Sequence, residues 1–148
     1  MQGKKILIAS DHGGFQLKEV LKIYLEKKGY EVVDYGTDST ESVNYPDYAK
    51  VLAKGIQKKI ARQGILICTS GIGMSIAANR YPFIRAALVA GPELAHMARS
   101  HNDANVLVFG AKYIKPDVAK KCIDEFLTTK FEGGRHECRV QALGRMGK

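Results

Sequence analysis

The chain has 148 residues, of which 45% are hydrophobic and 26% charged, so we expect a single domain (residues 1–148) with a sizeable core. No apolar stretch approaches the roughly 20 residues that a membrane helix needs, which argues against a membrane segment. The formal net charge is +8, but no basic stripe with interleaved aromatic residues appears, so the charge favours an anionic small molecule over nucleic acid.

Apolar runs and helical spacings alternate along the chain. Short apolar runs rich in β-branched residues predict five buried strands, at residues 6–9, 31–35, 65–68, 84–89 and 106–109. Helical spacing or an opening proline predicts a helix after each strand, beginning near Phe15, Pro46, Gly71, Pro92 and Pro116. The tail, residues 128–148, carries Gly133-Gly134 and then a short helical end.

This alternation predicts a parallel sheet, because strands joined through helices run in the same direction. We therefore expect an α/β fold, a Rossmann-like, doubly wound sheet of five parallel strands with helices on both faces. Ligands of such sheets bind beyond the carboxyl ends of the strands. That rule directs attention to Asp11-His12, to the loop that begins at Cys68, and to the segments after the fourth and fifth strands.

The loop 68–73 follows the most apolar strand and opens a helix. Gly71 and Gly73 would let backbone N–H groups converge on an anion, although the same glycines also suit a tight packing turn. Neither a complete dinucleotide fingerprint nor a P-loop is present. Cys68 lies at the mouth of this loop, where a helix N-terminus favours the thiolate, and the plainer alternative is a buried structural cysteine.

The three cysteines, Cys68, Cys122 and Cys138, are odd in number and widely spaced. No CxxC or Cys/His zinc spacing appears, so we expect free thiols, with no metal and no other cofactor. Free thiols suit a reducing compartment, which favours a cytoplasmic protein. Cys122 lies in an amphipathic helix and is expected in the core.

Polar residues on other segments can complete a site at the same edge of the sheet. Asp11-His12 follow the first strand, and His101-Asn102 end the helix after the fourth strand. Loop capping and compensation of a helix dipole explain such residues equally well.

Cations are available for a phosphate. Arg135 and Arg139 are four residues apart and share a helix face, and the guanidinium fork matches phosphate geometry. Lys112 follows the fifth strand, and a solvated helix remains the alternative for the arginines. A thiol base, an oxyanion cradle and a phosphate grip together suit proton transfer next to a carbonyl, with aldose–ketose isomerisation as the leading case.

The chain resembles ribose-5-phosphate isomerase type B, in the family that also contains galactose-6-phosphate isomerase. The matching segments span nearly the whole chain: residues 8–15, 45–47, 64–68, 71–79, 101–103 and 132–136. The resemblance implies interconversion of ribose 5-phosphate and ribulose 5-phosphate, a step of the pentose phosphate pathway, without a metal. It also implies a homodimer or homotetramer with shared active sites, in which the partner chain supplies the residues near His101 and Lys112.

The resemblance further implies a role for each matching residue. Cys68 would move the proton between C1 and C2, and Ser70 would supply a hydroxyl near O1 and O2. His101 would act as the acid that opens the furanose ring, with Asp11 assisting. The phosphate would be held by His12, Lys112, Arg135 and Arg139. Other substrate contacts would come from Tyr45, Thr69, Gly71, Ile72, Gly73, Ser75 and Asn102, with the backbone amides of residues 70–75 holding the enediolate.

Two positions depart from the pattern of this family. Thr69 stands where the family often has glycine, which requires an ordinary backbone angle, and Lys112 stands where it often has arginine. Two other functions remain open from the sequence. One is a six-carbon sugar-phosphate isomerase of the allose or galactose type, and the other is a non-catalytic module that binds a nucleotide or phosphate.

Overall fold

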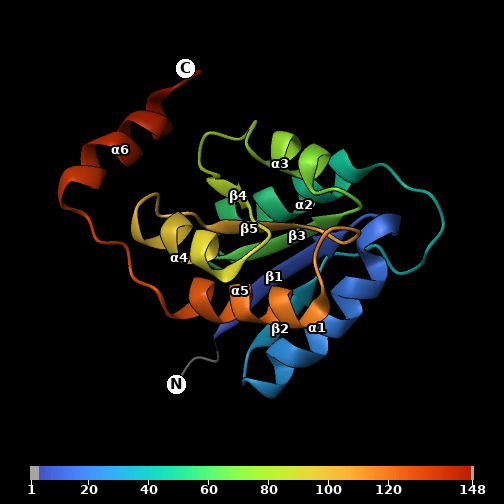
Figure 1. The fold of residues 1–148 in the computed structure, drawn as a ribbon. Coiled ribbons are helices and arrows are strands. Elements are labelled where there is room, and N and C mark those ends of the chain that lie inside the picture. Colours follow the sequence, from blue (N-terminus) through green and yellow to red (C-terminus); the bar gives the residue numbers. More distant parts are fainter. Residues whose placement is uncertain (1–3, 148) are drawn as a thin grey trace.

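The computed structural model describes residues 4–147 and consists of a sheet covered by helices on both faces (Figure 1). Five parallel strands form the sheet in the order β2-β1-β3-β5-β4. The strands are β1 (Lys5–Ser10), β2 (Glu31–Asp34), β3 (Gly64–Cys68), β4 (Ala86–Leu88) and β5 (Val106–Gly110). The predicted Rossmann-like architecture with five parallel strands is confirmed.

The helices form two layers. Helices α1 (Phe15–Lys27), α4 (Pro92–Ser100) and α5 (Pro116–Thr128) pack on one face of the sheet. Helices α2 (Tyr45–Gln57) and α3 (Ile72–Ala78) pack on the other. None of these helices, nor any other within the described residues, is long and apolar enough to cross a membrane.

Each face of the sheet has its own core, because side chains of a strand point alternately to opposite faces. In β1, Ile6 and Ile8 face the α1 side, and Leu7 and Ala9 face the α2 side. The central strands β3 and β5 are buried along their whole length, which explains why they appear in the sequence as continuous apolar runs. Cys122 is fully buried in the first core, as predicted.

Most predicted boundaries agree with the structure to within two residues. Pro46, Pro92 and Pro116 lie in the first turns of α2, α4 and α5. Strand β4 is shorter than the predicted 84–89, because the backbone N–H of Arg85 donates to Asn105 Oδ1 at 2.8 Å and the ladder begins only at the next residue.

The tail turns away after α5. The N–H of Glu132 donates to the carbonyl oxygen of Ser100 at 3.0 Å, which fixes the tail to the end of α4. A short 3₁₀ helix η2 (Gly134–His136) and the helix α6 (Glu137–Arg145) follow, and α6 stands apart from the sheet (Figure 1). No residue of α6 is buried, although the helix contains the apolar residues Val140 and Leu143. The predicted helical end is confirmed.

Candidate active site

The carboxyl ends of β1, β3 and β5 bring three of the predicted segments together. Ser10 pairs with Ile67, so Asp11 follows directly beside the end of β3. The N–H of Lys112 donates to the carbonyl oxygen of Thr69 at 3.0 Å, which joins the end of β5 to the same loop. We call the set at this edge the thiol half-site; its members are Asp11, His12, Tyr45, residues 68–75 and Lys112.

The loop after β3 wraps around its own thiol. Gly71 has φ of 78°, a left-handed conformation that favours glycine, and its N–H donates to Cys68 Sγ at 3.2 Å. The N–H of Ile72 donates to Ser70 Oγ at 3.2 Å, which leaves the Ser70 hydroxyl proton free to donate elsewhere. Cys68 is 5% exposed, so the sulfur sits in a shielded position with a backbone donor beside it.

The predicted oxyanion cradle is narrower than residues 70–75. The N–H groups of Gly71 and Ile72 are taken by Cys68 and Ser70, and that of Ser75 donates to the Gly71 carbonyl oxygen at 3.0 Å. Ser75 therefore has only its hydroxyl left for a ligand, which corrects the expectation for its amide. The first turn of α3 has no helix carbonyl for its N–H groups, which leaves those of Gly73 and Met74 as donors.

Asp11 and His12 are oriented by the backbone around them. Asp11 is buried, and its Oδ1 accepts from the N–H groups of Gly13 and Gly14 at 2.9 and 3.2 Å, capping the 3₁₀ helix η1 (His12–Gly14). The N–H of Val43 donates to His12 Nδ1 at 3.1 Å. Because Nδ1 accepts, the ring proton of a neutral His12 is on Nε2, which can donate to an anion.

Two close approaches fasten the rest of this half-site. A Cβ added to Gly73 would lie 2.6 Å from the Tyr45 ring, so this ring rests on the backbone of the Cys68 loop. A Cβ added to Gly13 would likewise overlap the Thr69 side chain, so this side chain packs directly on the Gly13 backbone. Thr69 is not among the residues with positive φ, so the loop accommodates this departure from the family with an ordinary backbone, as expected.

The remaining predicted residues lie at the opposite edge of the sheet. His101 and Asn102 precede β5, whose Val106 pairs with the first residue of β3, whereas Cys68 at the end of β3 pairs with Gly110. At about 3.3 Å per residue, four residues of strand separate the two edges by roughly 13 Å. We call His101, Asn102, Arg135 and Arg139 the histidine half-site. One chain therefore does not bring the two half-sites together.

The structure places the Lys112 backbone beside Thr69 of its own chain, at the edge of the sheet where Cys68 lies. In the histidine half-site, Arg135 belongs to η2 and Arg139 to α6, and both side chains are exposed. Both side chains can therefore contact a ligand that is bound by another chain.

Two residues that the sequence did not single out contact His101. The rings of His101 and His136 stack with centroids 4.3 Å apart and 14° between planes. Glu132 lies between them, with carboxylate oxygens 3.9 Å from His101 Nε2 and 3.7 Å from His136 Nε2. Burial, and then the positive charges of His101 and Arg135, lower the pKa of His136. No sequence spacing indicates this cluster, because Glu132 lies 31 positions after His101.

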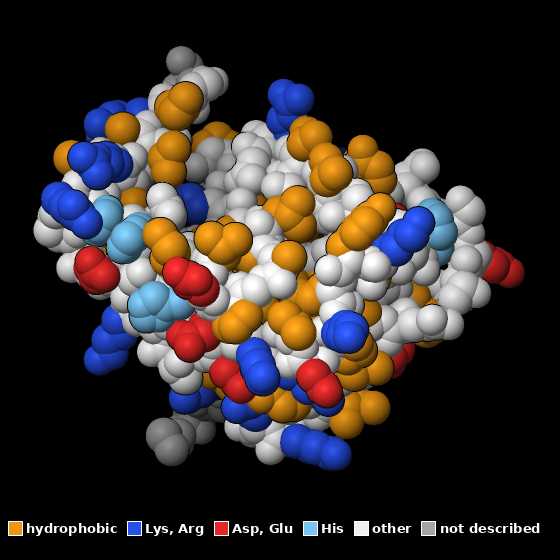
Figure 2. Space-filling view, in the orientation of Figure 1, with side chains coloured by type: hydrophobic (Ala, Val, Ile, Leu, Met, Phe, Trp, Pro, Cys, Tyr) orange, Lys and Arg blue, Asp and Glu red, His pale blue; other side chains and the backbone are white. Residues whose placement is uncertain are grey.

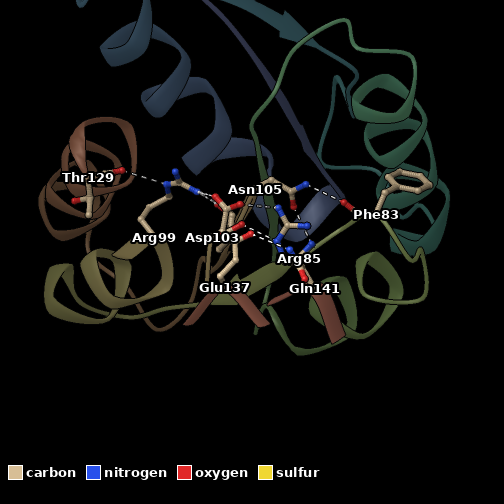
Figure 3. Close-up of polar contacts among 9 residues, drawn as sticks. Phe83, Arg85, Arg99, Asp103, Asn105, Thr129, Glu137 and Gln141 are labelled. Atoms are coloured by element: carbon tan, nitrogen blue, oxygen red, sulfur yellow. Dashed lines mark hydrogen bonds and ion pairs between the residues drawn. The ribbon is translucent and has the colours of Figure 1, made fainter. Parts of the chain in front are cut away.

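A polar network braces the loop that carries His101 (Figure 3). Asp103, with φ of 48°, accepts from Arg99 Nη1 at 2.8 Å through its carboxylate and from Arg85 Nε at 2.7 Å through its carbonyl. Asn105 Nδ2 donates to the carbonyl oxygen of Phe83 at 2.9 Å. The loop is therefore tied to α4 and to the segment that precedes β4, which fixes the position of His101.

Exposed apolar side chains lie between the two half-sites. They belong to α3, β4 and α4: Ile72, Ile76, Leu88, Leu94 and Met97. Figure 2 shows hydrophobic side chains gathered across the middle of this face, with histidines and basic residues toward both sides. We call this set the apolar band. Its side chains are 39–57% exposed among the described residues, so they are available to contact another surface.

Comparison with known proteins shows the family to which the chain belongs. The family model described as Ribose/Galactose Isomerase matches residues 6–143. Ribose-5-phosphate isomerase B of Escherichia coli is 44% identical over 95% of this chain and 94% of its own length. A crystal structure of a ribose 5-phosphate isomerase from Thermotoga maritima has a TM-score of 0.95 at 52% identity, covering 99% of this chain and all of that one. Ribose-5-phosphate isomerase B from Mycoplasma genitalium with bound ribulose-5-phosphate has a TM-score of 0.91 at 38% identity, over 95% of this chain and 94% of that one. The chain is therefore an enzyme of the ribose/galactose isomerase family.

Proposed function

We propose that this enzyme interconverts ribose 5-phosphate and ribulose 5-phosphate, with Cys68 as the base and with each active site shared between two subunits. One observation carries the proposal. The Cys68 sulfur accepts from the Gly71 amide at 3.2 Å and lies in a loop that also offers the Ser70 hydroxyl. A base and oxyanion donors in one shielded loop are what proton transfer next to a carbonyl needs.

The reaction begins with the open-chain aldose. The Cys68 thiolate removes the proton from C2, and the electrons move through C1 to its carbonyl oxygen, which gives an enediolate. The amides of Gly73 and Met74 and the Ser70 hydroxyl donate to the enediolate oxygens. The proton of the C2 hydroxyl passes to O1 within the enediolate. The thiol then returns its proton to C1, which leaves a hydroxyl at C1, the carbonyl at C2 and the thiolate restored.

The remaining groups open the ring and hold the phosphate. His101 of the partner subunit protonates the ring oxygen, and Asp11 accepts the proton of the anomeric hydroxyl. His12 Nε2–H and the Lys112 ammonium bind the phosphate from one chain. The partner's Arg135 and the partner's Arg139 bind it from the other, which supplies the bidentate contacts that Lys112 does not make.

A two-fold dimer follows from the separation of the half-sites. Each chain has its thiol half-site and its histidine half-site at opposite edges of the sheet, with the apolar band between them. In an isologous dimer the two bands face each other and each half-site meets its complement on the partner. The apolar band supports this arrangement, because exposed apolar patches on a stable protein commonly mark interfaces.

Turnover of ribose 5-phosphate tests the proposal. Cys68→Ala should lower kcat by about 10²–10⁴-fold, because it removes the base together with its hydrogen bond to the loop. Cys138→Ser is the matched control, because Cys138 is exposed and lies outside the loop, and it should retain wild-type turnover. Turnover by Cys68→Ala close to that of the wild type would contradict the assignment of the base.

Substrate comparison separates the alternative functions. The kcat/KM for ribose 5-phosphate should exceed that for allose 6-phosphate and for galactose 6-phosphate. The reverse order would favour a six-carbon isomerase that uses the same loop. Calorimetric binding of a nucleotide with no turnover of any sugar phosphate would favour a non-catalytic module.

A further inference from the structure

The histidine half-site contains a set of side chains suited to a metal ion. His101, Glu132 and His136 each offer one ligand atom, and these three atoms all lie within 4.8 Å of one another. Two imidazoles and one carboxylate form a ligand set that zinc enzymes use, with a fourth position left open. Among residues 4–147 no other three His, Cys, Asp or Glu side chains meet this condition.

The distances in the cluster suit a shared ion better than direct hydrogen bonds. The carboxylate oxygens of Glu132 lie 3.9 Å from His101 Nε2 and 3.7 Å from His136 Nε2. Both distances exceed those of N–H···O hydrogen bonds, which reach about 3.2 Å. Ligands of a tetrahedral zinc ion with bonds of roughly 2.1 Å lie about 3.4 Å apart. The side chains of His101 and Glu132 are 32% and 57% exposed, so they are free to close this small gap.

His136 provides an independent observation. It is 7% exposed, and its Nε2 has no hydrogen-bond partner although it points toward the Glu132 carboxylate. A buried polar atom without a partner costs about 1–3 kcal/mol, and an ion at this position would satisfy it.

We propose that His101, Glu132 and His136 bind a divalent transition-metal ion such as Zn²⁺, and that the bound ion inhibits the isomerase by occupying His101. Imidazole ligands favour transition metals over Mg²⁺ and Ca²⁺. A metal-bound His101 nitrogen has no proton to give to the furanose ring oxygen. The inhibition rests on the function proposed above, whereas the binding of the ion does not.

Absorption spectroscopy with Co²⁺ tests the site without using activity. Titration of the metal-free protein should saturate at one ion per chain with weak visible bands and without the strong near-ultraviolet band of thiolate ligation. Glu132→Gln should weaken Co²⁺ binding by at least roughly tenfold, because it removes a ligand. The matched control is Glu125→Gln, which also removes an exposed carboxylate next to a histidine, 3.2 Å from His96 Nδ1. Glu125 and His96 provide only two ligands, so this variant should leave the Co²⁺ affinity unchanged.

Activity then tests the inhibition. Zn²⁺ should inhibit the wild type, EDTA should restore it, and Glu132→Gln should resist Zn²⁺ when compared with its own metal-free rate. The site would be overturned by any of three results: no Co²⁺ binding, a thiolate band, or a Co²⁺ affinity equal to that of the wild type in both Glu132→Gln and His136→Gln. Equal Zn²⁺ sensitivity in Glu132→Gln would overturn the inhibitory role and point to Cys68. An inactive metal-free wild type would instead contradict the proposed function, while the Co²⁺ titration would still decide the site.

Discussion

At the scale of single residues, the contact between Gly73 and Tyr45 shows how the thiol half-site depends on the absence of a side chain. A Cβ at Gly73 would lie 2.6 Å from the Tyr45 ring, so Gly73→Ala must displace either the ring or the first turn of α3. The Gly73 amide is one of the two donors assigned to the enediolate. A displacement of about 1 Å can cost roughly 100-fold in rate, so we expect kcat/KM to fall by at least about tenfold.

Turnover kinetics and thermal unfolding together check this prediction. Alanine is the better helix former by about 1 kcal/mol, so Tm should change little while activity falls. Gly144→Ala is the matched control, because Gly144 lies in α6 with no atom within 4 Å of an added Cβ. This control should keep wild-type activity. If Gly73→Ala keeps wild-type kcat/KM, the loop does not hold the substrate in the way proposed.

The residue scale also separates what the sequence can reveal from what it cannot. Cys68, Asp11 and His12 could be found because residues that follow strands of a parallel sheet gather at one edge. Glu132 and His136 could not be found, because their contact with His101 arises where the tail is fixed to α4. That junction includes a backbone hydrogen bond, from Glu132 N–H to the Ser100 carbonyl, and backbone hydrogen bonds of this kind leave no pattern in the sequence.

At the scale of elements, a buried ion pair joins α1 to the edge strand β2. Lys18 Nζ contacts Asp34 Oδ2 at 2.6 Å, with the lysine side chain 1% and the aspartate 20% exposed. Burial alone would raise the pKa of Asp34, but hydrogen bonds from Lys18, the Gly36 amide and Lys22 outweigh it and hold the pKa below its ordinary value. The carboxylate is therefore ionised in the folded protein at neutral pH.

Removing this carboxylate should destabilise the fold. Asp34→Asn leaves Lys18 buried with only Glu19 as a charged partner, at 3.1 Å, so we expect the free energy of unfolding at pH 7 to fall by roughly 3 kcal/mol. Urea unfolding measures this loss. The matched control is Glu31→Gln, whose exposed pair with Lys5 spans 3.9 Å and should cost under about 1 kcal/mol.

The pH dependence of this loss has a definite sign. The folded pKa of Asp34 lies below its unfolded value, so its contribution is complete above the ordinary value of 3.8 and is lost as pH falls through the lower folded pKa. The stability difference between wild type and Asp34→Asn should therefore be constant from pH 5 to 7 and shrink in stronger acid. A difference that grows on acidification would contradict the ion pair as its origin.

The elements themselves were largely predictable because local signals agree with the fold. Prolines at the starts of α2, α4 and α5 and continuous apolar runs in β3 and β5 specify those elements locally. The start of β4 depends on a side chain from elsewhere, because Asn105 Oδ1 captures the Arg85 N–H. The strand order 2-1-3-5-4 follows from packing across both faces, which hydrophobic periodicity does not encode.

At the scale of the whole molecule, the separation of the two half-sites on one chain favours a dimer, because a complete site then needs residues from two chains. Cys68 and His101 lie at opposite ends of the β3–β5 pair, so no rotamer change can bring them to one substrate. The apolar band between them offers the surface through which two chains would meet. The sequence predicted the members of both half-sites, but their division between two edges of the sheet depends on the strand register.

Complementation between two inactive variants tests the shared site directly. Cys68→Ser damages only the thiol half-site and His101→Asn only the histidine half-site, so each homodimer should be inactive. Random pairing after co-expression gives mixed dimers as half of all molecules, each with one intact site of two, so about a quarter of wild-type specific activity should return. Co-expression of Cys68→Ser with Asp11→Asn, both in the thiol half-site, should give no gain over the separate variants. Absence of recovery in the first mixture, or sedimentation of the wild type as a single 16.3 kDa chain, would contradict the shared active site.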